Sequence, residues 1–214
     1  MSIITIDGPA GSGKSTVAKK LAKSLGFLYI DSGALYRAFA WGVLNSHIEN
    51  ISDYIKNFDI KYDYVDNMAK IWLFDKEITF DIRNEKISKE SSFFASKSNV
   101  RERITLIQRR IASDNDVVVE GRDTGTVVFS NADFKFYITA SLEERAKRRF
   151  LELKNNNKNI SLEDIKKSIK QRDLQDKNRK YAPLLKSEDA IEVDTTAKTI
   201  DEVVDFLLKF MRNE

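Results

Sequence analysis

The stretch Gly8-Pro9-Ala10-Gly11-Ser12-Gly13-Lys14-Ser15 fits the pattern G-x-x-x-x-G-K-[ST] and separates two segments of different character. The apolar, β-branched run Ser2–Asp7 before it predicts a buried strand. Apolar residues at helical spacing after it predict a helix over Ser15–Leu25 that ends at Gly26. Glycines let successive backbone N–H groups point at one anion, and the start of a helix adds a positive dipole. The stretch therefore predicts a loop that binds the phosphates of a nucleoside triphosphate.

Two side chains of this loop carry the expected chemistry. Lys14 supplies a mobile cation for the β- and γ-phosphates, and the hydroxyl of Ser15 reaches Mg²⁺. Asp7, at the end of the strand, either is structural, which we favour, or helps to order the metal shell. The motif leaves open whether the γ-phosphate is hydrolysed as in a switch, drives motion or is transferred to a small molecule. The expected nucleotide-binding residues are Gly8, Pro9, Ala10, Gly11, Ser12, Gly13, Lys14, Ser15 and Thr16.

Strand and helix patterns alternate along most of the chain, which is typical of an α/β fold with a parallel sheet and helices on both faces. One stretch breaks the alternation. There, three short apolar runs predict a small antiparallel meander inserted into the core, with a turn at Asp75–Glu77. The asparagine-rich stretch Lys154–Asn159 predicts a flexible polar connection between helices. The other predicted strands are Phe27–Ile30, Val117–Glu120, Phe134–Thr139 and Ala190–Asp194; the meander runs are Ile60–Tyr64, Ile71–Phe74 and Ile78–Phe80; the other helices are Val100–Ser113, Leu142–Lys154, Leu162–Asn178 and Thr199–Met211.

Composition excludes several classes of protein. The 214 residues suit one domain or a core with inserts. The sequence contains no cysteine, which excludes disulfide scaffolds, thiolate catalysis and cysteine-ligated metals, and the single histidine, His47, leaves too little for a histidine metal cluster or a Ser/His/Asp triad. A net charge of +3 is too balanced to indicate a nucleic-acid partner. The sequence has no signal-peptide pattern and no apolar run of the roughly 20 residues that a membrane helix needs. We therefore expect a cytoplasmic protein with no membrane or nucleic-acid partner.

Among nucleotide-binding classes, a small-molecule kinase fits best. A GTPase would want a guanine-reading Asn-Lys-x-Asp, which Asp176-Lys177-Asn178 does not match, and motor ATPases carry partner domains that this chain is too short to hold. A kinase needs a second site that holds the acceptor in line with the γ-phosphate. Arg37 and Arg122 lie beside glycines just past predicted strands, and parallel sheets bind ligands at the carboxyl ends of their strands. We expect both arginines to contact the acceptor.

Four further motifs accompany the phosphate loop in order along nearly the whole chain. They are Asp31-Ser32-Gly33-x-x-Tyr36-Arg37; Gly121-Arg122-Asp123-x-Gly125-Thr126-Val127-Val128-Phe129; Ala140-Ser141-x-x-Glu144-Arg145-Ala146-x-Arg148-Arg149; and Arg172-Asp173-x-x-Asp176-x-Asn178-Arg179-x-x-Ala182-Pro183-Leu184. Together with Asp194-Thr195-Thr196, they resemble bacterial-type cytidylate kinase, a nucleoside monophosphate kinase of the P-loop group. The resemblance departs at three positions: Glu120 stands where many members have aspartate, and Gln175 and Lys177 stand where arginine is frequent.

The resemblance implies a P-loop three-layer fold with a five-stranded parallel sheet, a small antiparallel β insert and a helical lid. It implies one domain over residues 1–214, with a monophosphate-binding insert at about 33–99 and a lid at about 149–179. It also implies a monomer that transfers the γ-phosphate of ATP to CMP or dCMP with Mg²⁺. Carried over to this sequence, the residues facing cytosine would be Ser32, Ser92, Arg101 and Asp123; Asp176 would hold the ribose hydroxyls; Arg37, Arg122, Arg172 and Arg179 would hold the acceptor phosphate. The catalytic group would be Lys14 with Arg122, Arg172 and Arg179.

The chemistry of cytosine agrees with two of those assignments. Its N4 amino group donates a hydrogen bond that Asp123 can accept, and its O2 and N3 accept hydrogen bonds that Arg101 can donate. Uracil reverses the pattern at N3 and at position 4 and would leave this pair badly matched. Two alternatives remain: a kinase for another acceptor such as UMP, AMP or a metabolite hydroxyl, and a nucleotide-binding regulator or RNA-associated protein that uses the phosphate loop as a switch.

Overall fold

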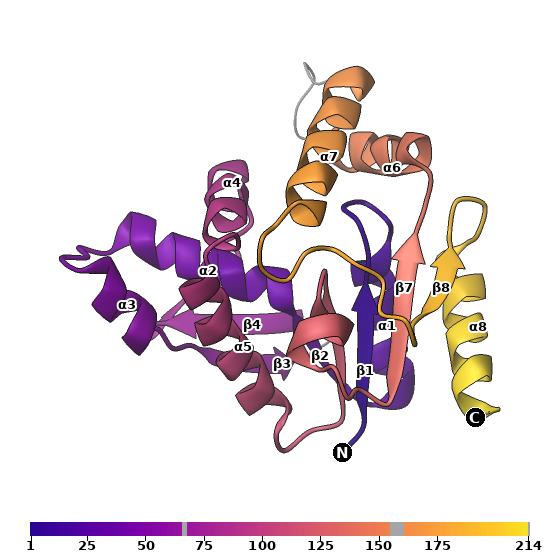
Figure 1. Ribbon diagram of the computed structural model, residues 1–214, viewed down its shortest axis with the longest axis horizontal. Helices are drawn as coiled ribbons and strands as arrows, with labels where there is room; N and C mark the ends of the chain where they lie inside the picture. Colours follow the sequence, from indigo (N-terminus) through magenta and orange to yellow (C-terminus); the bar gives the residue numbers. More distant parts are fainter. Residues whose placement is uncertain (66–67, 155–160, 214) are drawn as a thin grey trace.

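The computed structural model of the protein describes residues 1–65, 68–154 and 161–213. Its centre is a five-stranded sheet in the order β2-β6-β1-β7-β8, in which every neighbouring pair is parallel (Figure 1). This confirms the predicted parallel sheet, and each strand predicted for this sheet lies within one residue of its observed bounds. The strands are β1 (Ile3–Asp7), β2 (Leu28–Asp31), β6 (Val117–Gly121), β7 (Phe134–Thr139) and β8 (Ile191–Asp194).

Helices cover both faces of this sheet and bury two separate apolar cores. Along β6 the side chains alternate, so that Val118 joins the core under α1 (Lys14–Leu25) and α8 (Ile200–Arg212). Val117 and Val119 join the opposite core, under α2 (Ser32–Asn45) and α5 (Ser98–Ala112). A strand buried on both faces is apolar at most positions, which is why these runs are nearly continuous rather than alternating.

The insert between α2 and α5 carries a three-stranded antiparallel sheet of β3 (Lys61–Val65), β4 (Met68–Leu73) and β5 (Lys76–Glu77). The meander is confirmed, but its third strand was predicted wrongly at Ile78–Phe80. The chain turns at Phe74 and Asp75, both of which have positive φ. The turn was predicted at Asp75–Glu77, but Lys76 and Glu77 form strand β5. Just past Glu77 the N–H of Ile78 still donates to the carbonyl of Ile71 (2.8 Å), but the N–H of Ile71 donates to the hydroxyl of Thr79 (3.0 Å) and not to a backbone carbonyl. Helices α3 (Ile51–Asn57) and α4 (Glu85–Phe94) complete the insert.

One tyrosine joins the insert to the core. The hydroxyl of Tyr62 in β3 donates to the carbonyl of Tyr29 (2.7 Å) and accepts from the N–H of Asp31 (3.3 Å). Strand β2 is the edge of the large sheet, so this hydroxyl satisfies backbone groups that have no neighbouring strand.

A helical hairpin stands at the carboxyl ends of β1 and β7 (Figure 1). Its helices α6 (Leu142–Lys154) and α7 (Leu162–Lys177) pack through Ala146, Ile165 and Ile169. Residues 155–160 of the connection predicted to be flexible lie outside the described residues. In the described part of the chain, none of the helices has the length and hydropathy that crossing a bilayer requires.

Candidate active site

The phosphate loop connects β1 to α1 and depends on glycines at two places. A Cβ on Gly8 would lie 2.0 Å from the carbonyl oxygen of Ile138, so only glycine allows β7 to pass this close. Gly13 adopts φ 88° as the residue that caps α1, a left-handed conformation that glycine reaches at little cost. The loop therefore presents its N–H groups at the amino end of a helix, as the motif predicts.

Lys14 is buried at the floor of the loop, where its Nζ donates to the carbonyl of Pro9 (3.1 Å). Burial, followed by repulsion from the guanidinium of Arg122, lowers the pKa of Lys14 to about 7. Glu120 opposes this shift, and Arg172 adds to it. A lysine in these surroundings gains affinity for its proton when an anion arrives beside it.

Ser15, the residue predicted to reach the metal, donates its hydroxyl hydrogen to Oε1 of Glu120 (2.6 Å). The same carboxylate oxygen accepts a hydrogen bond from the hydroxyl of Tyr29 (3.1 Å). Glu120 is buried near the end of β6, which places its carboxyl group beside the phosphate loop. Glutamate at this position has the reach to contact the serine hydroxyl directly.

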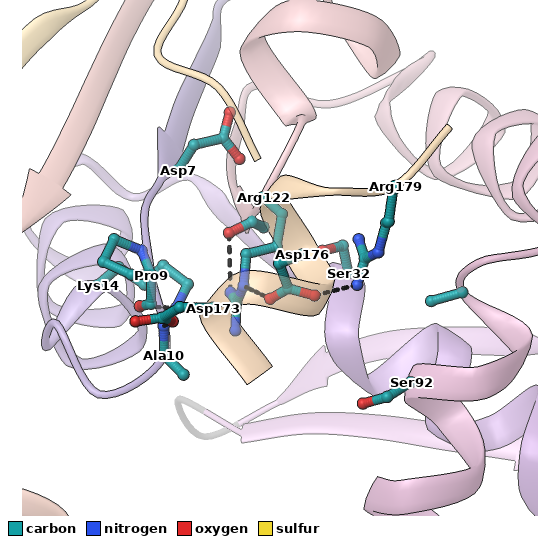
Figure 2. Close-up of polar contacts among 12 residues, drawn as sticks. Asp7, Pro9, Ala10, Lys14, Ser32, Ser92, Arg122, Asp173, Asp176 and Arg179 are labelled. Atoms are coloured by element: carbon teal, nitrogen blue, oxygen red, sulfur yellow. Dashed lines mark hydrogen bonds and ion pairs between the residues drawn. The ribbon is translucent and has the colours of Figure 1, made fainter. Parts of the chain in front are cut away.

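Arginines predicted to hold the acceptor phosphate gather around the buried carboxylate of Asp176. Arg122 donates from Nε to Asp176 Oδ2 (2.8 Å), and Arg179 donates to Oδ1 (Figure 2). Among the described residues, Nε of Arg172 is buried without a hydrogen-bond partner. Burial, and next the charge of Arg122, lower the pKa of Arg172 to about 10. Such a concentration of positive charge favours a bound anion.

Arg37 is the fourth of these arginines and extends from α2. Its guanidinium pairs with Asp31 (3.0 Å), and Asp31 also accepts from the N–H of Ala34 as the cap of α2. Arg37 is among the charges that lower the pKa of Arg172, so its charge is felt within the same cluster.

The two residues predicted to read the base lie together. Arg101 and Asp123 form a buried ion pair, and Arg101 also donates to the carbonyl of Ala95 (2.9 Å). The guanidinium of Arg101 lies 5.4 Å from the ring centre of Tyr36. In the described structure the buried hydroxyl of Tyr36 has no hydrogen-bond partner, a feature that the motif containing this tyrosine did not predict.

The two serines are placed differently. Ser32 donates its hydroxyl hydrogen to the carbonyl of Glu120 (2.6 Å), which ties the start of α2 to β6 near the arginine cluster. Ser92 donates to the carbonyl of Ser88 (3.2 Å) within α4. Over the described residues, no hydrogen bond joins Ser92 to Arg101 or Asp123, although Figure 2 shows it on the insert side of the cluster. Thr16 is exposed in the first turn of α1.

Asp173 of α7 and Arg145 of α6 both contact the phosphate loop at Ala10, and the sequence indicated no role for either residue. A further arginine of α6, Arg148, donates to the carbonyl of Ser12 (3.4 Å). Asp173 accepts from the N–H of Ala10 (3.2 Å), and Arg145 donates to the carbonyl of Ala10 (3.0 Å). Both belong to motifs quoted above, and Asp173 directly follows Arg172. Only their place in those motifs could have indicated them, because the contact joins segments more than 130 residues apart.

Asp7 has a structural role at the end of β1. Its carboxylate accepts from the N–H of Thr124 (2.9 Å), the hydroxyl of Thr124 (2.8 Å) and the N–H of Gly125 (2.8 Å). These contacts hold the short π-helical turn Thr124–Val128 that follows β6. Burial outweighs them and raises the pKa of Asp7 to about 6.

This shift predicts how stability depends on pH. The folded state binds the Asp7 proton more tightly than the unfolded state, so ionising Asp7 makes folding less favourable as pH rises from about 4 to about 6. The contribution reaches about 3 kcal/mol above that window. We expect the free energy of unfolding of Asp7→Asn, relative to wild type, to increase across this window in urea titrations. Parallel profiles for the two proteins would contradict the assignment.

A phosphate loop at the end of β1 thus faces an arginine cluster that includes residues at the ends of neighbouring strands. A nucleotide-binding loop beside a second anion site is the arrangement of a P-loop phosphotransferase. Residues 4–213 match the family model described as cytidylate kinase. The chain belongs to the cytidylate kinase family, which makes it a nucleotide kinase.

Individual relatives agree with this membership. The cytidylate kinase of Pseudothermotoga lettingae is 47% identical over 204 residues, which cover 95% of this chain and 91% of that protein. The cytidylate kinase of Clostridioides difficile is 44% identical over 208 residues, covering 95% and 94%. Among solved structures, shikimate kinase from Bacteroides thetaiotaomicron matches with a TM-score of 0.51 at 14% identity, covering 99% of this chain and 98% of that one. That likeness shows the fold alone.

Proposed function

We propose that the protein transfers the γ-phosphate of ATP to CMP or dCMP, giving ADP and CDP or dCDP, in a reaction that uses Mg²⁺. The observation that carries the proposal is the adjacency of two cationic sites, Lys14 in the phosphate loop and the arginines around Asp176. Each site contains a cation whose pKa is lowered by burial and by the charge of Arg122. Two phosphate groups brought to these sites would relieve that repulsion and lie next to each other.

The base is proposed to lie against Arg101 and Asp123. Cytosine offers a donor at N4 and acceptors at N3 and O2, which match a carboxylate beside a guanidinium. Buried polar groups left unpaired by uracil would disfavour UMP. Asp176 is proposed to turn from the arginines to the ribose hydroxyls once a phosphate takes its place as their anion. Ser32 and Ser92 are proposed to complete the pocket from α2 and α4.

Mg²⁺ fits the oxygen groups beside the phosphate loop. It is commonly bound through one or two protein oxygens, with phosphates and water completing its coordination. Ser15 supplies a hydroxyl and Glu120 a carboxylate, already in contact with each other. Bound there, the ion would neutralise charge on the transferred phosphate. In the part of the chain that the structure describes, no three acidic or histidine side chains gather as a metal group, so the phosphates are expected to supply the remaining ligands.

No side-chain base is needed for the reaction as proposed. The second pKa of a phosphate monoester is about 6, so the acceptor oxygen is already ionised at neutral pH. The protein then positions the two phosphates and neutralises their charge through Lys14, Arg122, Arg172 and Arg179. We propose that residues 33–99 form the monophosphate-binding insert and that residues at about 149–179, which include the second half of α6 and all of α7, act as a lid that excludes water.

The lowered pKa of Lys14 predicts that ATP binding takes up a proton. Above pH 7 the lysine of the free protein is largely neutral, and the arriving phosphates favour its charged form. We expect calorimetry at pH 8.5, in buffers of different ionisation enthalpy, to show uptake approaching one proton, with little uptake by Lys14 at pH 6. Arginine remains charged at both pH values. Lys14→Arg should therefore abolish the uptake, and equal uptake by that variant would contradict the assignment.

The proposal is tested by ADP release from Mg·ATP with CMP, dCMP, UMP, AMP and GMP in parallel. Rapid release with CMP and dCMP alone supports both the reaction and the base-reading pair. Release with UMP or AMP instead would keep the kinase but overturn the roles of Arg101 and Asp123. ATP binding without acceptor-dependent release would favour the regulator.

A further inference from the structure

Asp173 is an acidic residue inside a largely cationic site, and it contacts the phosphate loop directly. Its Oδ1 accepts from the N–H of Ala10 (3.2 Å), and its Oδ2 accepts from Arg145 (2.5 Å). The same nitrogen of Arg145 donates to the carbonyl of Ala10 (3.0 Å). The Asp173 and Arg145 side chains are only 13% and 9% exposed, so water screens this pair weakly. The contact joins three separate elements: the loop, α6 and α7.

Because Asp173 lies on α7, its contact with the loop also affects the arginine cluster that the same helix reaches. Arg172 precedes Asp173, and Asp176 follows one helical turn later and binds Arg122 (2.8 Å), the residue directly after β6. One helix therefore touches the ATP-binding loop through Asp173 and the acceptor-binding cluster through Asp176 (Figure 2). Arg172, on the same helix, belongs to that cluster as well. The contact between α7 and the loop therefore determines the distance between the ATP-binding loop and the arginine cluster.

We propose that Asp173 is a positioning residue, which holds α7 against the phosphate loop so that the acceptor phosphate meets the γ-phosphate in line. This inference rests on the proposed function and adds a residue to it. Asp173 touches neither nucleotide as proposed: it acts through the backbone of Ala10 and through Arg145. Arg145 is fixed in turn by a hydrogen bond from its Nε to the carbonyl of Ala140 (3.1 Å), at the start of the hairpin.

The role predicts a particular kinetic signature. Each nucleotide keeps its own binding residues when Asp173 is changed, so the KM for ATP and the KM for CMP should stay within about threefold of wild type. The transferred group is displaced, and a misplacement of about 1 Å can cost about 100-fold in rate. Asp173→Ala should therefore lower kcat by about 10- to 100-fold. Asp173→Asn keeps an oxygen for the Ala10 N–H but loses the ion pair, so its kcat should fall less.

A second readout does not depend on activity. The N–H of Ala10 is protected by the Asp173 carboxylate, so its hydrogen exchange should be at least about 10-fold faster in Asp173→Ala. The N–H of Val17, bonded within α1 to the carbonyl of Gly13 (3.0 Å), should exchange as in wild type. Glu163→Gln is the matched control, because it removes an exposed carboxylate from the first turn of the same helix. It should change neither kcat nor exchange at Ala10.

The kinetic and hydrogen-exchange results together test the positioning role of Asp173. A lowered kcat with unchanged KM values and faster exchange at Ala10 supports the positioning role. Faster exchange with unchanged kcat would overturn it, as would a KM change alone or an equal loss in Glu163→Gln. Unchanged exchange at Ala10 in Asp173→Ala would show that the contact does not hold the loop. A wild-type protein that transfers no phosphate to CMP would overturn the proposed function instead, whatever the exchange at Ala10.

Discussion

Replacing Lys14 with alanine is expected to lower kcat by at least about 100-fold, because it removes a preorganised charge from the transferred phosphate. The stability of the folded protein should not decrease. Lys14 is buried beside Arg122 and Arg172, and its lowered pKa means that its charge is unfavourable there without a ligand. We expect the free energy of unfolding of Lys14→Ala at pH 6 to equal or exceed that of wild type. Steady-state kinetics and urea unfolding on the same preparation measure both quantities.

Lys23→Ala is the matched control, since Lys23 is exposed in the last turn of the same helix, far along α1 from the loop. It should leave kcat unchanged. A kcat for Lys14→Ala within about fivefold of wild type would contradict the proposed mechanism, because Lys14 is the only charged side chain that the loop Gly8–Ser15 offers to the β- and γ-phosphates.

Asp123→Asn is expected to change which pyrimidine reacts. The carboxylate can only accept a hydrogen bond, which suits the N4 amino group of cytosine, whereas an amide can also donate to O4 of uracil. We expect kcat/KM for CMP to fall by at least about 100-fold while kcat/KM for UMP is unchanged or rises, so that the ratio of the two changes most. Initial rates with both acceptors measure that ratio.

The CMP-to-UMP ratio of kcat/KM distinguishes a change of base specificity from a loss of stability. Asp123 pairs with buried Arg101, so the substitution weakens a buried ion pair and is expected to destabilise the fold as well. Lost stability lowers the rates with CMP and UMP together and leaves their ratio intact. Asp114→Asn changes an exposed carboxylate in the connection that leads into the opposite, amino end of β6 and should alter neither rate. A CMP-to-UMP ratio unaffected by Asp123→Asn would show that this residue does not read the base.

The central sheet could be predicted because its strands are short continuous apolar runs between turn signals. The helices of the insert could not. Helix α2 is apolar almost all round and buried along most of its length, so it lacks the polar face that makes a helical period visible. Helix α3 has seven residues, fewer than two full turns. The turn at Phe74 and Asp75 carries none of the Gly or Asn residues that usually mark positive φ.

The residues of the site likewise fall into those that could be predicted from the sequence and those that could not. The phosphate loop is local in sequence, so its residues could be read directly. The arginine cluster depends on α7 lying beside β6, which no local pattern encodes; Arg172, Asp176 and Arg179 were reached only through the family resemblance. Contacts such as Asp173 with Ala10 depend on side-chain placement after folding and were not predicted at all.

In the proposed reaction, one phosphoryl group passes directly from ATP in the phosphate loop to the phosphate of CMP. This step is tested most directly by a single turnover with excess protein, [γ-³²P]ATP, Mg²⁺ and CMP, quenched over time and separated by chromatography. Direct transfer predicts that the label appears in CDP at the rate at which it leaves ATP, with little inorganic phosphate formed. Label released mainly as inorganic phosphate, or retained in ATP whether or not CMP is present, would contradict it.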